Sequence, residues 1–373
     1  MDARHIAGAV LGIALTAACV GLAGGASQAP ARHLLADDEG ALSELVIHYV
    51  PTAADLSPPV YRELLSALDD DVVVWTVVPD MAAFDDLVAR LGDAADAGPT
   101  LVPVPVGHAM TTWSRDRWLA LAPEDPSDPV TILAPSAEDG SERWPARAGD
   151  ARTGRDLAAE PFARAAFERS ALYFDGGDFV ADAEVAFVTP RVLRRSAGRV
   201  VEDREHLAHA LELTLGKRVV LLDEAPEHHA GMFMMPIRGR RMLVGDPSLA
   251  AALVDDPEAL VPLGGGPDFS AATQARFDAV ADAVRDAGYT VTRIPIVPGR
   301  DGRTWWTWLN GLVETRDGGG HVYMPTFGAP PALREAAEAV WRDAGYTVHP
   351  VDATSAYTHF GSLRCLVNVL RRR

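Results

Sequence analysis

The sequence contains very little cysteine. Its two cysteines are Cys19, which lies in an N-terminal stretch resembling a removable leader, and Cys365 near the other end. A lone remaining thiol has no partner for a disulfide, so a fold stapled by disulfides is excluded. Cys365 is therefore either an inert core residue, which is the commoner state of a free cysteine, or a nucleophile. The second interpretation requires a base, an orienting carboxylate and a substrate-holding group elsewhere in the chain.

Positive charge is also scarce, because 34 basic residues stand against 52 acidic ones and give a formal net charge of -18. Binding to nucleic-acid phosphates needs a positive face, so a nucleic-acid partner is not expected, whereas a cationic small substrate is tolerated. The sequence lacks a metal-ligand spacing, a phosphate-binding loop and a nucleophile-elbow serine. These absences argue against metal hydrolases, nucleotide enzymes and serine hydrolases, and no cofactor is expected.

A long uncharged run extends from Ile6 to Ala26, and it follows the basic start of the chain. The apolar run and the small residues before Ser27 predict a secretory signal over residues 1–26. We therefore expect an exported protein that is periplasmic, secreted or surface-anchored. A retained membrane anchor and a lipid anchor at Cys19 are the alternatives. The high Gly and Ala content of the run argues against a permanent span.

Residues 27–42 are small and polar and are predicted to be a linker, and residues 43–373 are predicted to be the folded domain. There, apolar runs of strand length alternate with segments of helical periodicity, which predicts an α/β fold. The expected strands are 45–50, 72–78, 101–106, 131–133, 185–188, 218–222, 242–244, 291–296, 321–324 and 347–351. The expected helices are 60–68, 81–91, 161–168, 202–215, 271–287 and 332–343. Residues 123–156 and 263–267 are predicted to be inserted loops.

An internal sequence repeat indicates a repeated structural unit. The segment Val284-Arg285-Asp286-Ala287-Gly288-Tyr289-Thr290-Val291 recurs as Trp341-Arg342-Asp343-Ala344-Gly345-Tyr346-Thr347-Val348, which is an offset of 57 residues. Both copies predict a helix that ends at glycine before a strand. A period near 57 residues indicates several such units in a propeller-like ring.

Residues that can carry chemistry recur at about this period. They are Asp116, then Asp175 with Asp178, His229, Asn310 and Cys365, and only the interval from His229 to Asn310 departs from the period. Equivalent positions of repeats in a ring converge on its axis, so these side chains are expected around one cavity. Each also has an ordinary structural explanation, such as an ion pair for Asp116 beside Arg115, a glycine turn for Asp175 and a core position for Cys365.

Several short motifs follow one another along the chain. They are Trp113-Ser114-Arg115-Asp116, Phe174-Asp175-Gly176-Gly177-Asp178-Phe179, His229-Ala230-Gly231-Met232-Phe233, Leu243-Val244-Gly245-Asp246-Pro247, Leu309-Asn310-Gly311-Leu312, Val322-Tyr323-Met324-Pro325-Thr326-Phe327-Gly328 and Gly361-Ser362-Leu363-Arg364-Cys365. Together they resemble the pentein, or guanidino-group-modifying, superfamily, and most nearly its agmatine deiminase and bacterial peptidylarginine deiminase branch. The resemblance covers roughly residues 45 to 370. It implies a fivefold pseudosymmetric α/β propeller of ββαβ units.

The resemblance also implies roles for these side chains. Cys365 would attack the guanidinium carbon as a thiolate, and His229 would protonate the leaving amine and later activate water. Asp116 would hold the guanidinium through charge-assisted hydrogen bonds, while Asp175 would orient His229. The implied substrate-binding set is Asp116, Asp178, Asn310, Arg115, Trp113 and Arg364.

Two positions depart from the family pattern. Gly231 stands where the family carries the aspartate of a His-x-Asp motif, which is the second guanidinium clamp. Removing one carboxylate from a buried cation site costs about 3 to 5 kcal/mol, and Asp178 or Glu227 are candidates to replace it. Arg364 stands where the family carries a histidine before the cysteine. It would favour the thiolate but repel a guanidinium, unless it pairs with a carboxylate of the substrate or of the protein.

The resulting hypothesis is an exported deiminase-like hydrolase that acts on agmatine, an arginine derivative or peptidyl arginine. The alternatives are a pentein-fold binding protein without turnover, an amidinotransferase and, less supported, a Cys–His peptidase. The expected partner is a small guanidino compound or an arginine-containing peptide. The sequence does not indicate the oligomeric state.

Overall fold

The structure is a computed structural model that describes residues 31–96, 98–136, 145–260 and 263–373. The predicted signal segment and Cys19 lie outside the described residues. Residues 31–373 form one unit, and the strands of this unit make five separate sheets of three or four strands. No helix in the described ranges has the length and apolarity needed to cross a membrane.

The five sheets are built in the same way. Two strands pair antiparallel, and one or two helices then connect the second strand to a third strand that lies parallel to it. Three sets have one helix: β18 (Val367–Arg372), β2 (Leu42–His48), α1 (Ser57–Ala67) and β3 (Val73–Val78); β5 (Leu119–Pro123), β6 (Val130–Ala134), α3 (Pro145–Ala159) and β7 (Ala165–Arg169); and β15 (Leu312–Arg316), β16 (Gly319–Thr326), α8 (Pro331–Asp343) and β17 (Tyr346–Asp352). Two sets have two helices: β8 (Phe179–Ala181), β9 (Val185–Val188), α4 (Pro190–Ser196), α5 (Arg204–Leu215) and β10 (Arg218–Leu221); and β11 (Met234–Ile237), β12 (Arg241–Asp246), α6 (Pro247–Ala251), α7 (Ala271–Asp286) and β13 (Thr290–Pro298).

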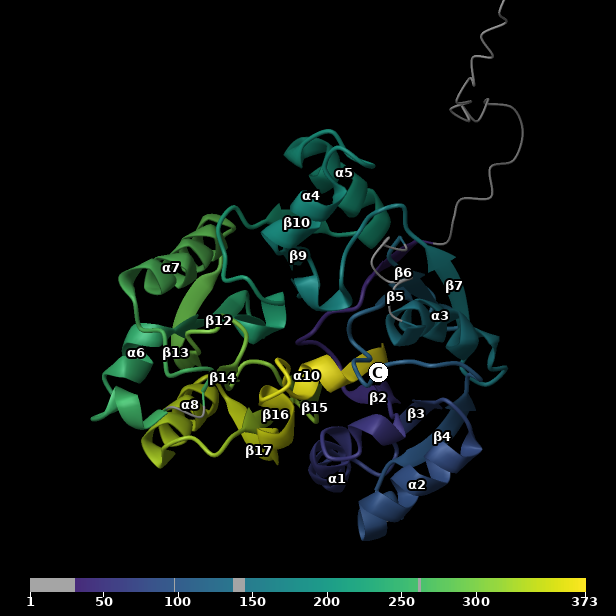
Figure 1. Ribbon diagram of the computed structural model, residues 1–373. Helices are drawn as coiled ribbons and strands as arrows, with labels where there is room; N and C mark the ends of the chain where they lie inside the picture. Colours follow the sequence, from purple (N-terminus) through teal and green to yellow (C-terminus); the bar gives the residue numbers. More distant parts are fainter. Residues whose placement is uncertain (1–30, 97, 137–144, 261–262) are drawn as a thin grey trace, which may run out of the picture. The chain divides into compact units, whose positions relative to one another are not determined.

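Some elements extend this arrangement. After β3, helix α2 (Met81–Leu91) leads to strand β4 (Thr100–Pro105), which pairs with β3. Strand β1 (Arg32–Leu34) pairs with β5, and strand β14 (Trp305–Thr307) pairs with β13. Two short helices, α9 (Thr354–Tyr357) and α10 (Leu363–Leu366), lead into β18. Along the chain the sheets follow one another around the middle of the unit (Figure 1), and β18 returns to pair with β2.

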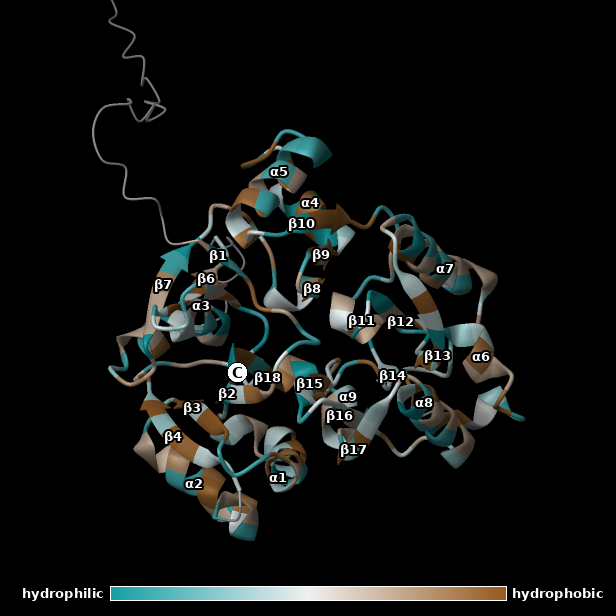
Figure 2. Ribbon diagram, turned by 180° about the vertical axis from the view of Figure 1, so that it is seen from behind, coloured by the Kyte–Doolittle hydropathy of each residue, from teal (hydrophilic) through white to brown (hydrophobic). Residues whose placement is uncertain are grey.

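The sequence pattern explains why these elements form. The run Val73–Val78 lies between two parallel neighbours, β2 and β4, and its last five residues are buried, as expected for a strand covered on both faces. Helix α7 buries Phe277, Val280, Ala281 and Val284, which lie on one helical face and pack into an apolar cluster with strands β12 and β13. Figure 2 shows both apolar and polar colour on helices such as α5 and α7, as the amphipathic pattern requires.

The two copies of the internal sequence repeat form two equivalent helix–strand connections, from α7 to β13 and from α8 to β17. Gly288 and Gly345 follow the two helices with φ angles of 91° and 92°. An L-residue with a side chain rarely adopts such a φ angle, so the glycine in both copies is required by the turn. The repeated sequence therefore encodes the same supersecondary unit twice.

Two expectations from the sequence are wrong. Residues 161–168 were expected to be helical, but Ala165–Arg169 forms β7, parallel to β6, because pairing with a neighbouring strand outweighs a weak helical pattern. Residues 145–156 of the expected inserted loop belong to α3. Glycines at 149 and 154 lower the helix propensity of this stretch, yet a Cβ at position 149 would lie 1.6 Å from the carbonyl oxygen of Ala109, so the packing requires glycine there.

The folded unit begins earlier than residue 43. Strand β1 and the buried Asp37 both lie within residues 27–42, the stretch that the sequence suggested as a linker. Asp37 pairs with Arg364 at 2.5 Å, far away in the sequence. From Ala31 onward these residues belong to the same unit as the sheets.

Candidate active site

The side chains proposed from the sequence as nucleophile, base and clamp line one cavity. Cys365, His229 and Asp116 all contribute to a cavity of about 380 Å³. The remaining lining residues are Thr111, Trp113, Arg147, His359, Phe360 and Gly361. A volume of this size falls within the range of small-molecule sites.

A simple topological rule places the chemistry-bearing residues. Each one precedes the first strand of an antiparallel pair by two to five residues. Asp116 precedes β5, Asp175 precedes β8, His229 precedes β11, Asn310 precedes β15 and Cys365 precedes β18. The five positions are thus equivalent in the five repeated units. Their spacing in the sequence reflects this equivalence.

Cys365 lies in the short helix α10 and is 5% exposed. Its thiol donates to Oδ1 of Asn310 at 3.4 Å, and the backbone nitrogen of Arg364 donates to the Asn310 carbonyl oxygen at 3.0 Å. Asn310 is itself buried. The two residues are therefore held together by side-chain and backbone contacts from different parts of the chain.

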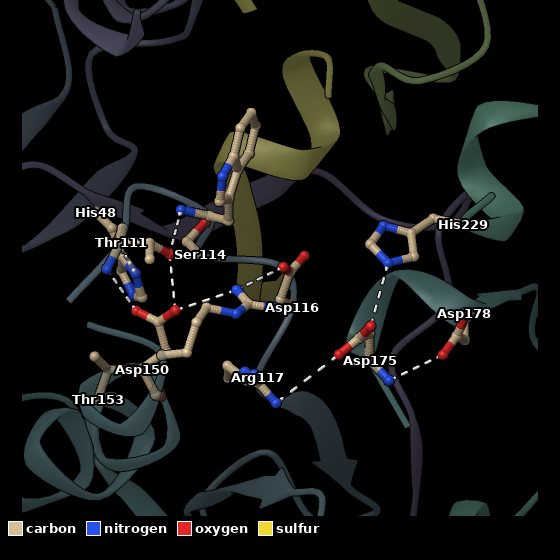
Figure 3. Close-up of polar contacts among 12 residues, drawn as sticks. His48, Thr111, Ser114, Asp116, Arg117, Asp150, Thr153, Asp175, Asp178 and His229 are labelled. Atoms are coloured by element: carbon tan, nitrogen blue, oxygen red, sulfur yellow. Dashed lines mark hydrogen bonds and ion pairs between the residues drawn. The ribbon is translucent and has the colours of Figure 1, made fainter. Parts of the chain in front are cut away.

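His229 lies between Asp175 and the cavity. Its Nε2 is 3.6 Å from Oδ2 of Asp175 (Figure 3), whereas its buried Nδ1 has no hydrogen-bond partner among the residues that the structure describes. Burial alone would lower the pKa of His229, but the interactions with Asp175 and Cys365 outweigh it and raise the pKa to about 10. The imidazole is therefore protonated at neutral pH, with Nδ1 as the nitrogen that can act on a substrate.

The two glycines between Asp175 and Asp178 allow this approach of the histidine. A Cβ at Gly177 would lie 2.5 Å from the ring atoms Cγ and Nδ1 of His229, so any side chain there would displace the imidazole. The flanking carboxylates close a small turn, because the Asp175 backbone nitrogen donates to Asp178 at 2.9 Å. The turn from Asp175 to Asp178 therefore packs directly against the imidazole of His229.

His228 is a functional candidate that the sequence did not single out. Its Nδ1 accepts the backbone N–H of His229 at 2.9 Å, and its ring contacts Trp305 with a centroid distance of 5.2 Å. Burial lowers the pKa of His228 to about 3. A neutral ring is required for this acceptor role, so His228 is a positioning residue for His229. The only sequence signal was the doubled histidine.

Asp175 and Asp178 are surrounded by arginines. Arg191 and Arg195 each lie 3.2 Å from Oδ2 of Asp175, and they lie 3.4 and 3.5 Å from Asp178. Burial opposes ionisation of Asp175, but the hydrogen bond to His229 and the charges of Arg195 and Arg117 hold its pKa below the ordinary range. Asp178 is fully buried and accepts from Thr189 at 2.9 Å. It does not line the cavity.

Asp116 is already paired within the chain. Nη1 of Arg147 donates to Oδ2 of Asp116 at 2.9 Å and to Oδ2 of Asp150 at 3.2 Å. Asp150 is fully buried and accepts from the backbone nitrogen and hydroxyl of Thr111, both at 2.7 Å (Figure 3). Burial opposes the charge of Arg147, but Asp116 and Asp150 outweigh it and raise its pKa. Arg147 was not among the site residues predicted from the sequence, because it lies in the stretch 123–156 that was expected to be an inserted loop. Its i,i+3 spacing from Asp150 was the available signal.

The two positions that depart from the family pattern lie together in space. A Cβ at Gly231 would lie 3.1 Å from Nη1 of Arg364 and 3.3 Å from Nδ2 of Asn310. The Arg364 side chain therefore occupies the space next to Gly231. Arg364 is 3% exposed and pairs with Asp37, so its partner is a carboxylate of the protein.

The other sequence candidates divide into two groups. Trp113 lines the cavity, whereas Arg115 and Arg364 do not. Arg115 is buried and donates to Oδ1 of Asn368 at 2.8 Å, which ties the segment before β5 to strand β18. Glu227, suggested as a replacement clamp, pairs with Arg194 at 2.6 Å, and both side chains are more than half exposed.

The sequence matches no family model and no curated protein. Solved structures do resemble the chain. A Cys-to-Ser variant of the C. jejuni agmatine deiminase with substrate bound has a TM-score of 0.68 at 13% identity, covering 94% of this chain and 99% of that one. The agmatine deiminase of Enterococcus faecalis has a TM-score of 0.66 at 12% identity, covering 91% and 95%. SxtG, an amidinotransferase from Microseira wollei, has a TM-score of 0.50 at 16% identity, covering 91% and 98%.

At these identities the similarity establishes the fold. It extends over nearly the whole of both chains in each comparison, so it concerns the complete set of five sheets. The chain thus has a mixed α/β fold shared with pentein enzymes that act on guanidino groups.

Proposed function

Proceeding from the fold that the chain shares with guanidino-modifying enzymes, we propose that it is a deiminase-like hydrolase. It would cleave a C–N bond of a guanidino group in agmatine, an arginine derivative or peptidyl arginine, through a covalent intermediate on Cys365. The observation that carries the proposal is the meeting of Cys365, His229 and Asp116 in one cavity, with Asp175 behind His229.

Two further expectations belong to this proposal. The five repeated ββαβ sets would form the blades of a fivefold pseudosymmetric propeller, which the pairing of β18 with β2 closes. Residues 1–26 would direct export and then be removed. Export of the full chain, followed by N-terminal sequencing of the mature protein, tests the second point.

The first half of the reaction forms a carbon–sulfur bond. The Cys365 thiolate attacks the guanidinium carbon and gives a tetrahedral intermediate. Protonated His229 donates its proton to the departing nitrogen, whose bond to carbon breaks, and ammonia leaves. An amidino-thioether on Cys365 remains, and the imidazole is now neutral.

The second half uses water as the nucleophile. Neutral His229 takes a proton from water, and the resulting hydroxide adds to the amidino carbon. The carbon–sulfur bond then breaks and restores the Cys365 thiolate, while the hydroxyl proton of the product passes to bulk water. A neutral urea is released, and the histidine is left protonated as at the start. Asp175 stabilises the imidazolium in the states that carry it. Asn310 fixes the position of the thiol through its Oδ1.

Product release from a panel of guanidino compounds tests the proposal. Purified protein is incubated with agmatine, arginine, methylarginines and arginine-containing peptides, and ammonia and the urea-type product are measured. We expect stoichiometric ammonia and urea-type product from at least one of them. Cys365→Ala should lower the rate by about a thousandfold or more. If none of these compounds yields product, the hydrolase proposal is wrong.

A binding protein without turnover is the second candidate. It is favoured by Gly231, which supplies no second carboxylate, and by the pairing of Asp116 with Arg147. Labelling with a haloacetamidine separates the two candidates, because this cation carries its reactive carbon to the thiol. Rapid, saturable labelling of Cys365 supports the enzyme. Labelling no faster than that of a free thiol supports the binding protein.

A further inference from the structure

Positive charges lie in the cavity wall and around Asp175 behind it, more than a plain cation-binding site would need. Arg147 contacts Asp116 at 2.9 Å, and Arg195 contacts Asp175 at 3.2 Å. The raised pKa of His229 adds another positive charge at neutral pH. The carboxylates nearest the reacting groups therefore already have cationic partners within this chain.

Arg147 is held at one nitrogen only. Its Nη1 bonds to Asp116 and to Asp150, and Asp150 is fixed in turn by two bonds from Thr111. Nε and Nη2 of Arg147 make no hydrogen bond with any described residue. The side chain is 27% exposed and lines the cavity, so these nitrogens remain as donors.

A substrate guanidinium held on Asp116 would lie close to the Arg147 guanidinium. Only Oδ1 of Asp116 is without a hydrogen bond from a described residue, because Oδ2 accepts from Arg147. Two like charges that share one carboxylate repel each other. This repulsion is relieved when the substrate also carries an anion that the remaining Arg147 donors can bind, and a planar guanidinium is well matched to a carboxylate.

We propose that Arg147 determines specificity by selecting guanidino substrates that carry a carboxylate over those that carry a second positive charge. The inference rests on the proposed function and narrows it to guanidino acids, including arginine-type compounds. Arg147 binds the substrate carboxylate through Nε and Nη2 while Nη1 keeps its contacts with Asp116 and Asp150.

A matched substrate pair tests this assignment. Agmatine and 5-guanidinopentanoate both have four methylene groups between the guanidino group and an ammonium or a carboxylate, respectively. The ratio of their kcat/KM values is measured for the wild type, Arg147→Gln and Arg155→Gln. We expect the wild type to prefer the carboxylate compound, and Arg147→Gln to reduce this preference by at least about tenfold, with the loss mainly in KM.

Arg155→Gln is the control, because Arg155 lies on the same helix but stacks on Phe167 at 5.2 Å and does not line the cavity. It removes the same charge from the protein and should leave the ratio unchanged. Arg147→Met, which retains an unbranched apolar stem, is a second variant that should show the same loss. Circular dichroism establishes that each variant is folded.

The possible outcomes separate the inference from the proposed function. If the wild type releases product from no guanidino compound, the proposed function fails. If it releases product but the ratio is unchanged in both folded Arg147 variants, the inference fails and the function stands. A rise in kcat/KM of similar size for both substrates would identify Arg147 as an internal competitor for Asp116, which also overturns the inference.

Discussion

At the scale of single residues, the adjacent histidines His228 and His229 have opposite protonation preferences. Asp175 and Cys365 raise the pKa of His229 to about 10, while burial lowers that of His228 to about 3. The neutral ring accepts the backbone N–H of the charged residue. The pair thus joins a protonated imidazole to a neutral neighbour that fixes its position.

This difference predicts opposite pH dependences of stability. For His229, whose pKa is raised on folding, the stabilisation is complete below the ordinary value of 6.5 and is lost as the pH rises towards 10. The difference in the free energy of unfolding between the wild type and His229→Gln should therefore be largest at pH 6 and shrink at higher pH. Urea denaturation measures it, and a difference that grows with pH would contradict the assignment.

His228→Gln is the matched comparison. The pKa of His228 is lowered on folding, so its stabilisation is present above 6.5 and is lost as the pH falls towards 3. The difference between the wild type and this variant should shrink on acidification from pH 7 to pH 4. Equal pH profiles for the two variants would show that the two histidines do not differ as described.

At the scale of elements, helix α3 carries the guanidinium of Arg147, which lines the cavity and pairs with Asp116. It begins at Pro145, and Arg147 and Asp150 lie in its first two turns. The helix can approach the segment around Ala109 only because residue 149 is glycine. The position of Arg147 on Asp116 therefore depends on backbone packing two residues away.

Gly149→Ala is predicted to destabilise the protein strongly. Its Cβ would lie 1.6 Å from the Ala109 carbonyl oxygen, which is backbone and cannot move aside as a side chain can. We expect a loss of about 3 kcal/mol in the free energy of unfolding, measured by chemical denaturation. Gly328→Ala is the control, because a Cβ there has no neighbour within 4 Å, and it should change stability little. Similar losses for both variants would refute the packing argument.

At the scale of the whole folded unit, contacts between distant parts of the chain support the cavity. Asp37 before β2 pairs with Arg364 beside Cys365, and Ala41 and Arg373 exchange backbone hydrogen bonds of 2.8 and 3.0 Å. Burial opposes ionisation of Asp37, but Arg364 and Arg115 outweigh it and lower its pKa. The charged pair thus ties the segment that carries Cys365 to the segment before β2.

Removing Asp37 should leave a buried positive charge without its partner. We expect Asp37→Ala to lower the free energy of unfolding by about 3 to 5 kcal/mol. The double variant Asp37→Ala with Arg364→Met should lose clearly less, because no unpaired charge remains. Thermal or urea denaturation of the wild type, both single variants and the double variant gives the coupling. Additive losses would show that the two residues act independently.

The lowered pKa of Asp37 gives this pair a pH dependence as well. Its stabilisation is present above the ordinary value of 3.8 and is lost as the pH falls through the lowered value. The extra stability of the wild type over Asp37→Ala should therefore persist at pH 5 and decline only in more acidic solution.

The sequence by itself determined the alternation of strands and helices and four of the residues that line the cavity, namely Trp113, Asp116, His229 and Cys365. Most second and third strands of the repeated units contain a short apolar run, so local pattern was enough to find them, whereas β7, with the sequence AAFER, was predicted to be helical. The first strands, β5, β8, β11, β15 and β18, were not predicted. They are three to six residues long and follow directly on the polar segments that carry the site residues, so they have little periodicity of their own.

Only the tertiary structure decided which charges meet. Asp116 pairs with Arg147, and Arg364 pairs with Asp37 rather than lining the cavity. These partners are 31 and 327 residues apart. Periodicity reports the environment of a residue along its own element, whereas an ion pair of this kind depends on how separate elements pack. The reacting groups could therefore be named from the sequence, but the charge balance around them could not.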